Sequence, residues 1–298
     1  MKLTEAFNQY IKIRIMGRGC SPRTLEYYKQ NQKNATKYFG DIKISKITPE
    51  LVAKYYTDLV NTNIVNGCRH APGTARREIY TLKSVLGYWS RRGIKTVNID
   101  DIEIPRERIN PPRWLERYEV EEFINTVCRP CRGYPHINII RNELIMRLLF
   151  CSGIRVSELV ALDRDSIRNG QFIVTGKSKD PRVCFVTHEI EELISKYLEM
   201  REDNNRALFV SSQNPDKRLT TSTVRLIFRR NCKRCDIKGV HPHTMRHSFA
   251  TYMISNGADI RQVATLLGHQ NIQTTERYTH IKNEGLRQIH MKIMAKSY

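Results

Sequence analysis

The sequence predicts a mainly α-helical protein with one small β-hairpin, divided into two domains. Apolar residues recur at helical spacing through most of the chain. Residues 171–186 instead read as strand, polar turn and strand. Residues 94–113 contain three prolines and no helical period, which is typical of a linker. We therefore expect a helical domain over residues 1–93, a linker over 94–113 and a mixed α/β domain over 114–298.

The first domain is expected to contain four helices. Ser21 precedes Pro22, and Thr48 precedes Pro49, so each pair predicts an N-cap followed by proline in the first helical turn. Glycines follow the second and fourth helical patterns and predict their ends. The expected helices cover about residues 3–13, 22–39, 49–59 and 74–92.

The second domain alternates helical patterns with the single hairpin. Amphipathic helices are expected over residues 117–127 and 137–151. Short apolar strands at 171–174 and 182–186 flank a polar turn that contains Gly176 and Pro181. Further helices are expected at 188–200, 221–232, 243–256, 259–267 and 273–279, and a basic amphipathic tail follows at 282–298.

Charge and composition narrow the class of protein. The chain has a formal net charge of +20 and a pI near 9.8, which favours a polyanionic partner such as nucleic acid. Its start does not read as a signal peptide and no stretch is long enough to span a membrane, so a cytoplasmic location is expected. Reduced thiols are then expected, although Cys128/Cys131 and Cys232/Cys235 leave a zinc site open.

Three segments carry residues suited to phosphodiester cleavage. Without metal ligands, the charge of the transition state must be stabilised by Arg, His or Lys. His243 and Arg246 would share one face at a helix N-terminus, where phosphate binding is favoured. His269 follows a helix-ending glycine, and Arg155 follows a glycine-containing turn. Each could equally be an ordinary surface residue, and Tyr278 is one tyrosine among 14.

The sequence segments around these residues resemble motifs of the tyrosine recombinases, also called phage-type integrases and Xer recombinases. SGIRVSELVALDRDSI resembles the first-arginine box of that family, and TGKSKDPR resembles its lysine-bearing turn. HPHTMRHSFATYMISNGADIRQVATLLGHQNIQTTERYTH resembles its long box that ends in the tyrosine. The resemblance implies a two-domain, Xer-like recombinase with a SAM-like, core-binding first domain and a catalytic second domain.

The resemblance also implies a role for each matching residue. Tyr278 would attack DNA and form a 3′-phosphotyrosine. Arg155 and Arg246 would clamp the scissile phosphate. His269 would add a hydrogen bond to that phosphate, and His243 would act as acid or base. Lys177 would protonate the 5′ leaving oxygen, although Lys179 in the same turn is an alternative.

The expected partner is a double-stranded DNA recombination site. DNA strands would be exchanged between two such sites through a Holliday junction. The resemblance implies a homotetramer on DNA, coupled through the C-terminal tail, and no cofactor. Two alternatives stay open. A type IB topoisomerase would use the same chemistry to relax DNA, and a non-catalytic DNA-binding protein would have lost it. All six catalytic-type positions are filled, which argues against the second alternative.

Overall fold

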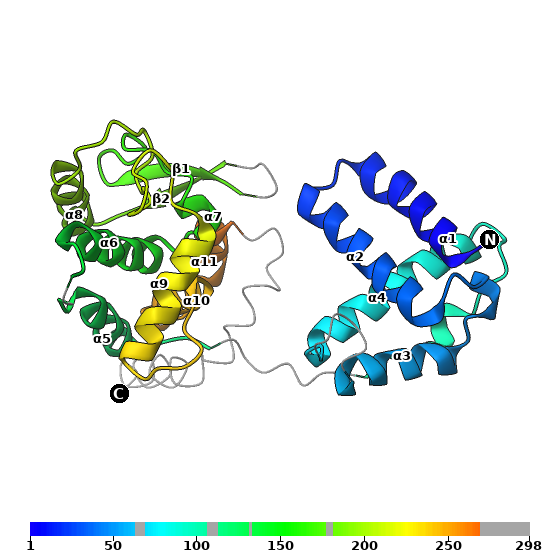
Figure 1. Ribbon diagram of the computed structural model, residues 1–298. Helices are drawn as coiled ribbons and strands as arrows, with labels where there is room; N and C mark the ends of the chain where they lie inside the picture. The colour runs from blue at the N-terminus through cyan, green and yellow to red at the C-terminus, as the bar shows by residue number, and fades with distance from the viewer. Residues whose placement is uncertain (63–68, 106–112, 131–132, 177–180, 269–298) are drawn as a thin grey trace, which may run out of the picture. The chain divides into compact units, whose positions relative to one another are not determined.

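The computed structural model describes residues 1–62, 69–105, 113–130, 133–176 and 181–268. The chain divides into two compact units, Met1–Ile109 and Asn110–Tyr298 (Figure 1). Within the described residues both units are mainly helical, and the second contains a two-stranded sheet, which confirms the predicted fold class.

The first unit is built on four helices that share one apolar core. They are α1 (Leu3–Tyr10), α2 (Pro22–Phe39), α3 (Pro49–Asn61) and α4 (Pro72–Ser90). Ser21 and Thr48 cap α2 and α3 as expected, because each side chain accepts a hydrogen bond from a backbone N–H in the first turn. The first helix differs from the prediction, since it continues after Tyr10 as a π-turn over Ile11–Ile15.

The expected linker contributes to this core. Val97 and Ile102 are buried among the side chains of the first unit, and the short 3₁₀ helix Ile99–Asp101 lies between them. Three prolines and the lack of a helical period predicted a linker from residue 94. The structure instead packs the described residues 94–104 onto the first unit, since their isoleucines and valine provide apolar surface to bury.

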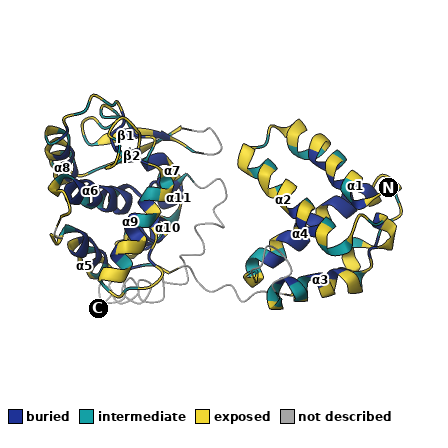
Figure 2. Ribbon diagram, viewed as in Figure 1, coloured by how far each residue is buried: buried dark blue, intermediate teal, exposed yellow. Residues whose placement is uncertain are grey.

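The second unit surrounds one buried helix, α6 (His136–Ser152). It packs against α5 (Arg117–Cys128), α8 (His188–Glu199) and α10 (Pro242–Ser255). Twelve residues of α6 are buried, so the amphipathic helix expected at 137–151 is in fact covered nearly all round (Figure 2). Such a helix fixes the position of the loops at both of its ends.

Three smaller elements and two more helices complete the described part of this unit. α7 (Val156–Leu159) is a single turn that begins directly after Arg155. β1 (Gln171–Thr175) pairs antiparallel with β2 (Pro181–Phe185), with Ile173 opposite Val183. α9 (Thr221–Arg234) and α11 (Ile260–Leu267) follow near the predicted bounds.

No helix in the described ranges is both long enough and apolar enough to cross a membrane. The predicted helix at 273–279 and the tail at 282–298 lie outside the described residues.

Candidate active site

Arg155 lies at the N-cap of α7, directly after the turn that ends α6. Its backbone N–H donates to Glu158 Oε2 at 2.8 Å, and its Nη1 donates to Glu158 Oε1 at 2.8 Å. The side chain is 27% exposed, so a ligand can reach it from solvent. Glu158, three residues after Arg155, therefore holds the Arg155 side chain in place.

The turn before Arg155 requires glycine at position 153. Gly153 has φ +61°, and a Cβ there would lie 2.5 Å from Phe249 Cδ1 and 2.9 Å from Leu267 Cδ2. A larger residue would therefore meet both backbone strain and a steric clash. Glycine lets α6 end against α10 and α11, which brings the Gly153 carbonyl within reach of α10.

Arg246 is the residue of α10 that uses this carbonyl. Its Nη1 donates to Gly153 O at 2.7 Å and its Nη2 donates to Leu267 O at 2.6 Å. The residue is 5% exposed, and both of these acceptors are neutral backbone oxygens. Because the two carbonyls belong to the ends of α6 and α11, Arg246 joins the turn before Arg155 to the end of α11.

The end of α11 lies close to Arg155. Asp259 caps the N-terminus of α11 in a capping box with Gln262, and Gly268 ends the helix with φ +63°. Arg155 Nη2 lies 3.5 Å from Gly268 O, at the long limit of a hydrogen bond. Gly268 is the residue directly before His269 in the sequence.

The hairpin adds Arg182, a residue whose role sequence reasoning missed. Its Nη1 and Nη2 donate to the two carboxylate oxygens of Glu158 at 3.0 and 2.6 Å, and its Nε donates to Leu266 O at 2.9 Å. Burial alone would raise the pKa of Glu158, but the hydrogen bonds from Arg182 and Arg155 outweigh it and lower that pKa. Glu158 therefore stays ionised and connects β2 to α7. The turn sequence offered only a choice of basic residues, so spacing could not single out this pair.

Gly176 brings the other end of the hairpin to the same place. A Cβ on Gly176 would lie 3.4 Å from Arg155 Nη1 and 3.7 Å from Glu158 Oε1. Gly176 directly precedes Lys177 in the sequence. The described ends of two separate segments, Gly176 and Gly268, thus both lie against the arginines of this site.

His243 lies in the first turn of α10, three residues before Arg246, as predicted. The pKa of His243 is lowered, first by partial desolvation of the ring and then by the charges of His241, Arg246 and Arg155. The neutral imidazole is therefore favoured near neutral pH, the form that can accept a proton. His241 caps the helix, since its Nδ1 accepts from Thr244 N at 3.2 Å.

The structure thus brings together Arg155, His243 and Arg246. Lys177, Lys179, His269 and Tyr278 lie outside the described residues. Cys131 lies outside them too. Among the described side chains no group of three or more His, Cys, Asp or Glu is placed to hold a metal ion. The Sγ atoms of Cys232 and Cys235 donate to the carbonyls of Val240 and Asn231 instead.

Comparison with known proteins identifies the class of this fold and site. Residues 113–284, more than half of the chain, match the phage integrase family. The chain belongs to that family. Residues 2–60 match the N-terminal SAM-like domain of phage integrases. The protein is therefore a site-specific tyrosine recombinase of the Xer and integrase type, an enzyme that breaks and rejoins DNA.

Individual relatives match nearly the whole chain. Tyrosine recombinase XerC of Lactobacillus delbrueckii subsp. bulgaricus is 30% identical, with 96% of each chain covered. XerC of Staphylococcus aureus is 28% identical, covering 97% of this chain and 95% of the relative. Among solved structures, XerH bound to difH in a post-cleavage complex aligns with a TM-score of 0.73 at 19% identity, covering 96% of this chain and 84% of XerH. The lambda integrase tetramer on a Holliday junction gives 0.73 at 19% identity, covering 91% and 78%. The two structural matches support the fold.

Proposed function

We propose that Arg155 and Arg246 bind the scissile phosphate of a double-stranded DNA recombination site and that Tyr278 attacks it. One observation carries the proposal. Both guanidinium groups are hydrogen-bonded to carbonyls at the end of α11, the segment that leads directly to His269 and on to Tyr278. Two arginine forks at fixed positions can hold the non-bridging oxygens of a phosphodiester.

The chemistry is a transesterification. The phenolic oxygen of Tyr278 attacks phosphorus, with His243 as the group that accepts or returns its proton. The bond from phosphorus to the 5′ oxygen breaks, and Lys177 gives that oxygen a proton. The DNA is left joined to the enzyme as a 3′-phosphotyrosine, and His269 donates a hydrogen bond to the phosphate. Attack by the 5′ hydroxyl of a second strand reverses the steps and regenerates Tyr278. The covalent link conserves the energy of the broken bond, so the proposal needs no cofactor.

The assembly is proposed on the relatives. XerH is described bound to difH and lambda integrase as a tetramer on a Holliday junction. We infer that this chain likewise acts as a homotetramer on DNA, with strand exchange through a Holliday junction and the tail at 282–298 docked on a neighbouring subunit. A DNA substrate of this kind fits the cytoplasmic location expected from the sequence. Replacing Ile289 with aspartate should abolish tetramers on a synthetic junction in mass photometry while leaving binding of one protomer to a half-site intact. Tetramers of unchanged stability would refute a role for the tail.

The central test is a suicide substrate, a duplex of the protein's recombination site with a nick beside the scissile phosphate. The site itself is obtained by sequencing DNA crosslinked to the protein in cells. Wild-type protein should form a covalent adduct on a denaturing gel, and Tyr278→Phe should form none. Tyr252→Phe, which removes a hydroxyl from a partly exposed tyrosine of α10, is the matched control and should retain the adduct. An adduct of equal yield with Tyr278→Phe would exclude Tyr278 as the nucleophile.

A further inference from the structure

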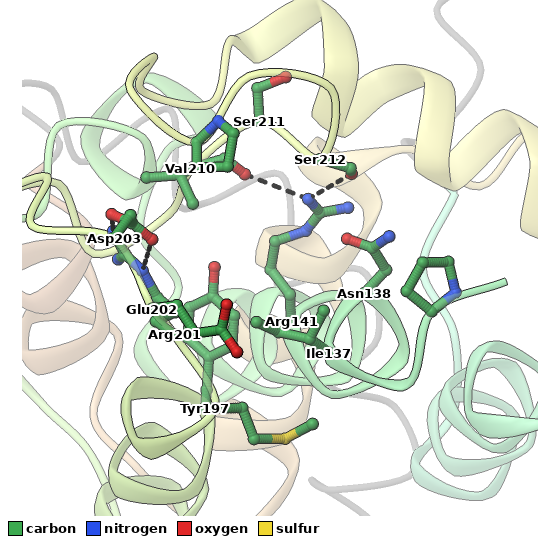
Figure 3. A pocket seen from close by; sticks show the side chains of 13 residues that line it. Ile137, Asn138, Arg141, Tyr197, Arg201, Glu202, Asp203, Val210, Ser211 and Ser212 are labelled. Carbon is green, nitrogen blue, oxygen red and sulfur yellow. Dashed lines mark hydrogen bonds and ion pairs between the residues drawn. The ribbon is translucent and has the colours of Figure 1, made fainter.

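A pocket of about 490 Å³ lies in the second unit beside the N-terminal turns of α6 (Figure 3). Its lining includes Arg141 and the first-turn residues Ile137 and Asn138. It is well separated from the active site, because α6 rises about 1.5 Å per residue and the Gly153 carbonyl follows at its other end. The distance along the helix axis is then roughly 18 Å from Arg141 to Gly153.

Arg141 is a buried cation whose hydrogen-bond partners are all neutral. The residue is 3% exposed. Its Nη1 donates to Val210 O at 3.1 Å and to Ser212 Oγ at 2.7 Å, contacts that Figure 3 marks. Its Nε and Nη2 donate to Asn142 Oδ1 at 3.3 and 3.0 Å. Within the described part of the chain, Arg141 has no acidic partner. An arginine remains protonated in proteins, so this charge is buried with no carboxylate bonded to it among the described residues, and the Glu202 carboxylate of the same pocket is exposed to solvent.

A second arginine of the same pocket, Arg201, differs from Arg141 because it has an acidic partner. Arg201 is also buried, but its guanidinium is paired with Asp203, which Arg164 contacts at 3.1 Å as well. The hydrogen bond from Arg201, then that from the backbone N–H of Asn205 and the charges of Arg201 and Arg164, lower the pKa of Asp203 to about 2. Asp203 is thus committed to Arg201 and Arg164. The neutral acceptors around Arg141 accept hydrogen bonds from its guanidinium but do not neutralise its positive charge.

The start of α6 independently favours an anion at this position. Its N-cap is Pro135, which offers no capping side chain, and its first turn contains no acidic residue. The backbone N–H groups of the first turn carry the positive end of the helix dipole. Ile137 and Asn138 precede Arg141 by four and three residues, so all three lie on one face of α6 and line the pocket together. The N-terminus of α6 and the Arg141 guanidinium therefore both favour a negative charge at the same place in the pocket.

The other walls indicate the kind of anion. Pro135, Ile137, Met200 and Pro215 give the pocket apolar surface. One uncompensated guanidinium balances one negative charge. We propose that this pocket binds a carboxylate carried on an apolar body, with the carboxylate against Arg141 and the body against these apolar side chains. The site is separate from the DNA-cleaving site and does not depend on the roles proposed for Arg155, Arg246 or Tyr278.

The sharpest variant is Asn142→Asp, because it places a carboxylate of the same size where Asn142 Oδ1 already accepts from Arg141. The Asn142 side chain also donates to Tyr134 Oη at 2.9 Å, and a tyrosine hydroxyl can reverse and donate to aspartate. The internal carboxylate should neutralise Arg141 and remove the need for a ligand. Glu202→Gln is the matched control, since it removes an exposed carboxylate from the same pocket and leaves Arg141 unchanged.

The experiment measures benzoate binding to the full chain by isothermal titration calorimetry at constant ionic strength, with inorganic phosphate as the second probe. Wild type should bind benzoate more tightly than phosphate. Asn142→Asp should bind benzoate at least tenfold more weakly while melting no earlier than wild type, and Glu202→Gln should bind at least as tightly as wild type. Absence of benzoate binding to wild type, equal binding by Asn142→Asp, or tighter binding of phosphate would each overturn the proposal. The suicide-substrate assay is unaffected by any of these results and tests the proposed function separately.

Discussion

Replacing Gly153 with alanine adds one methyl group where α6, α10 and α11 meet. At φ +61° an alanine costs about 1–2 kcal/mol relative to glycine. The new Cβ would also lie 2.5 Å from Phe249 Cδ1 and 2.9 Å from Leu267 Cδ2, and overpacking of this kind costs about 1–3 kcal/mol. The two terms together predict a loss of about 2–5 kcal/mol in the free energy of unfolding.

Differential scanning calorimetry checks this magnitude. For a unit of this size, each kcal/mol shifts Tm by about 2–4 °C, so Gly153→Ala should lower the melting temperature of the second unit by roughly 4–20 °C. Because the Gly153 carbonyl accepts from Arg246 Nη1, the folded fraction should also form less covalent adduct with the suicide substrate.

Gly257→Ala is the control for backbone strain without a clash. Gly257 has φ +93°, and no heavy atom lies within 4 Å of a Cβ built on it. This variant should lose about 1–2 kcal/mol and keep its cleavage activity. If Gly153→Ala is no less stable than Gly257→Ala, the argument that close packing demands glycine at position 153 is wrong.

Three further predictions concern the charged groups of the site. Glu158→Gln should lower stability by about 3–5 kcal/mol in urea unfolding, because it leaves Arg182, whose side chain is 9% exposed, without its carboxylate; a loss below 1 kcal/mol would contradict this. Arg246→Lys should slow adduct formation by about 10²-fold or more in single-turnover assays, because an ammonium cannot span both carbonyls, and a wild-type rate would refute it. Burial lowers the pKa of both His241 and His243, so the unfolded chain binds more protons and stability should fall as pH drops below about 6.5. His241→Ser keeps a capping side chain and should flatten that dependence in melts from pH 5 to 8; an unchanged slope would exclude His241 as a contributor.

Local signals in the sequence predicted the helix ends well. Ser21, Thr48 and Asp259 cap helices through contacts within two or three residues, and Gly268 ends α11 in the left-handed conformation. Such features are determined by the residues next to them, so a single sequence contains the information. The same holds for the Arg155–Glu158 contact, which spans three residues.

Contacts between distant segments could not be predicted in this way. Arg182 pairs with Glu158 from 24 residues away, and Arg246 reaches Gly153 across 93 residues. Both depend on which elements pack together, and helical periodicity does not specify that. The isolated charge of Arg141 escaped notice for the same reason, because only the packed structure shows that its acceptors are neutral. The positions of Lys177, His269 and Tyr278 relative to the arginines stay predictions.

The contacts of Arg246 and Arg155 also affect when the enzyme can act. Their carbonyl partners lie 93, 21 and 113 residues away along the chain. Contacts of such large sequence separation form only when the intervening chain has folded. A growing polypeptide that ends before α11 has both arginines and Gly153 but lacks the Leu267 and Gly268 carbonyls. We therefore expect both arginines to reach their final positions only late in folding, after α11 has packed beside α10.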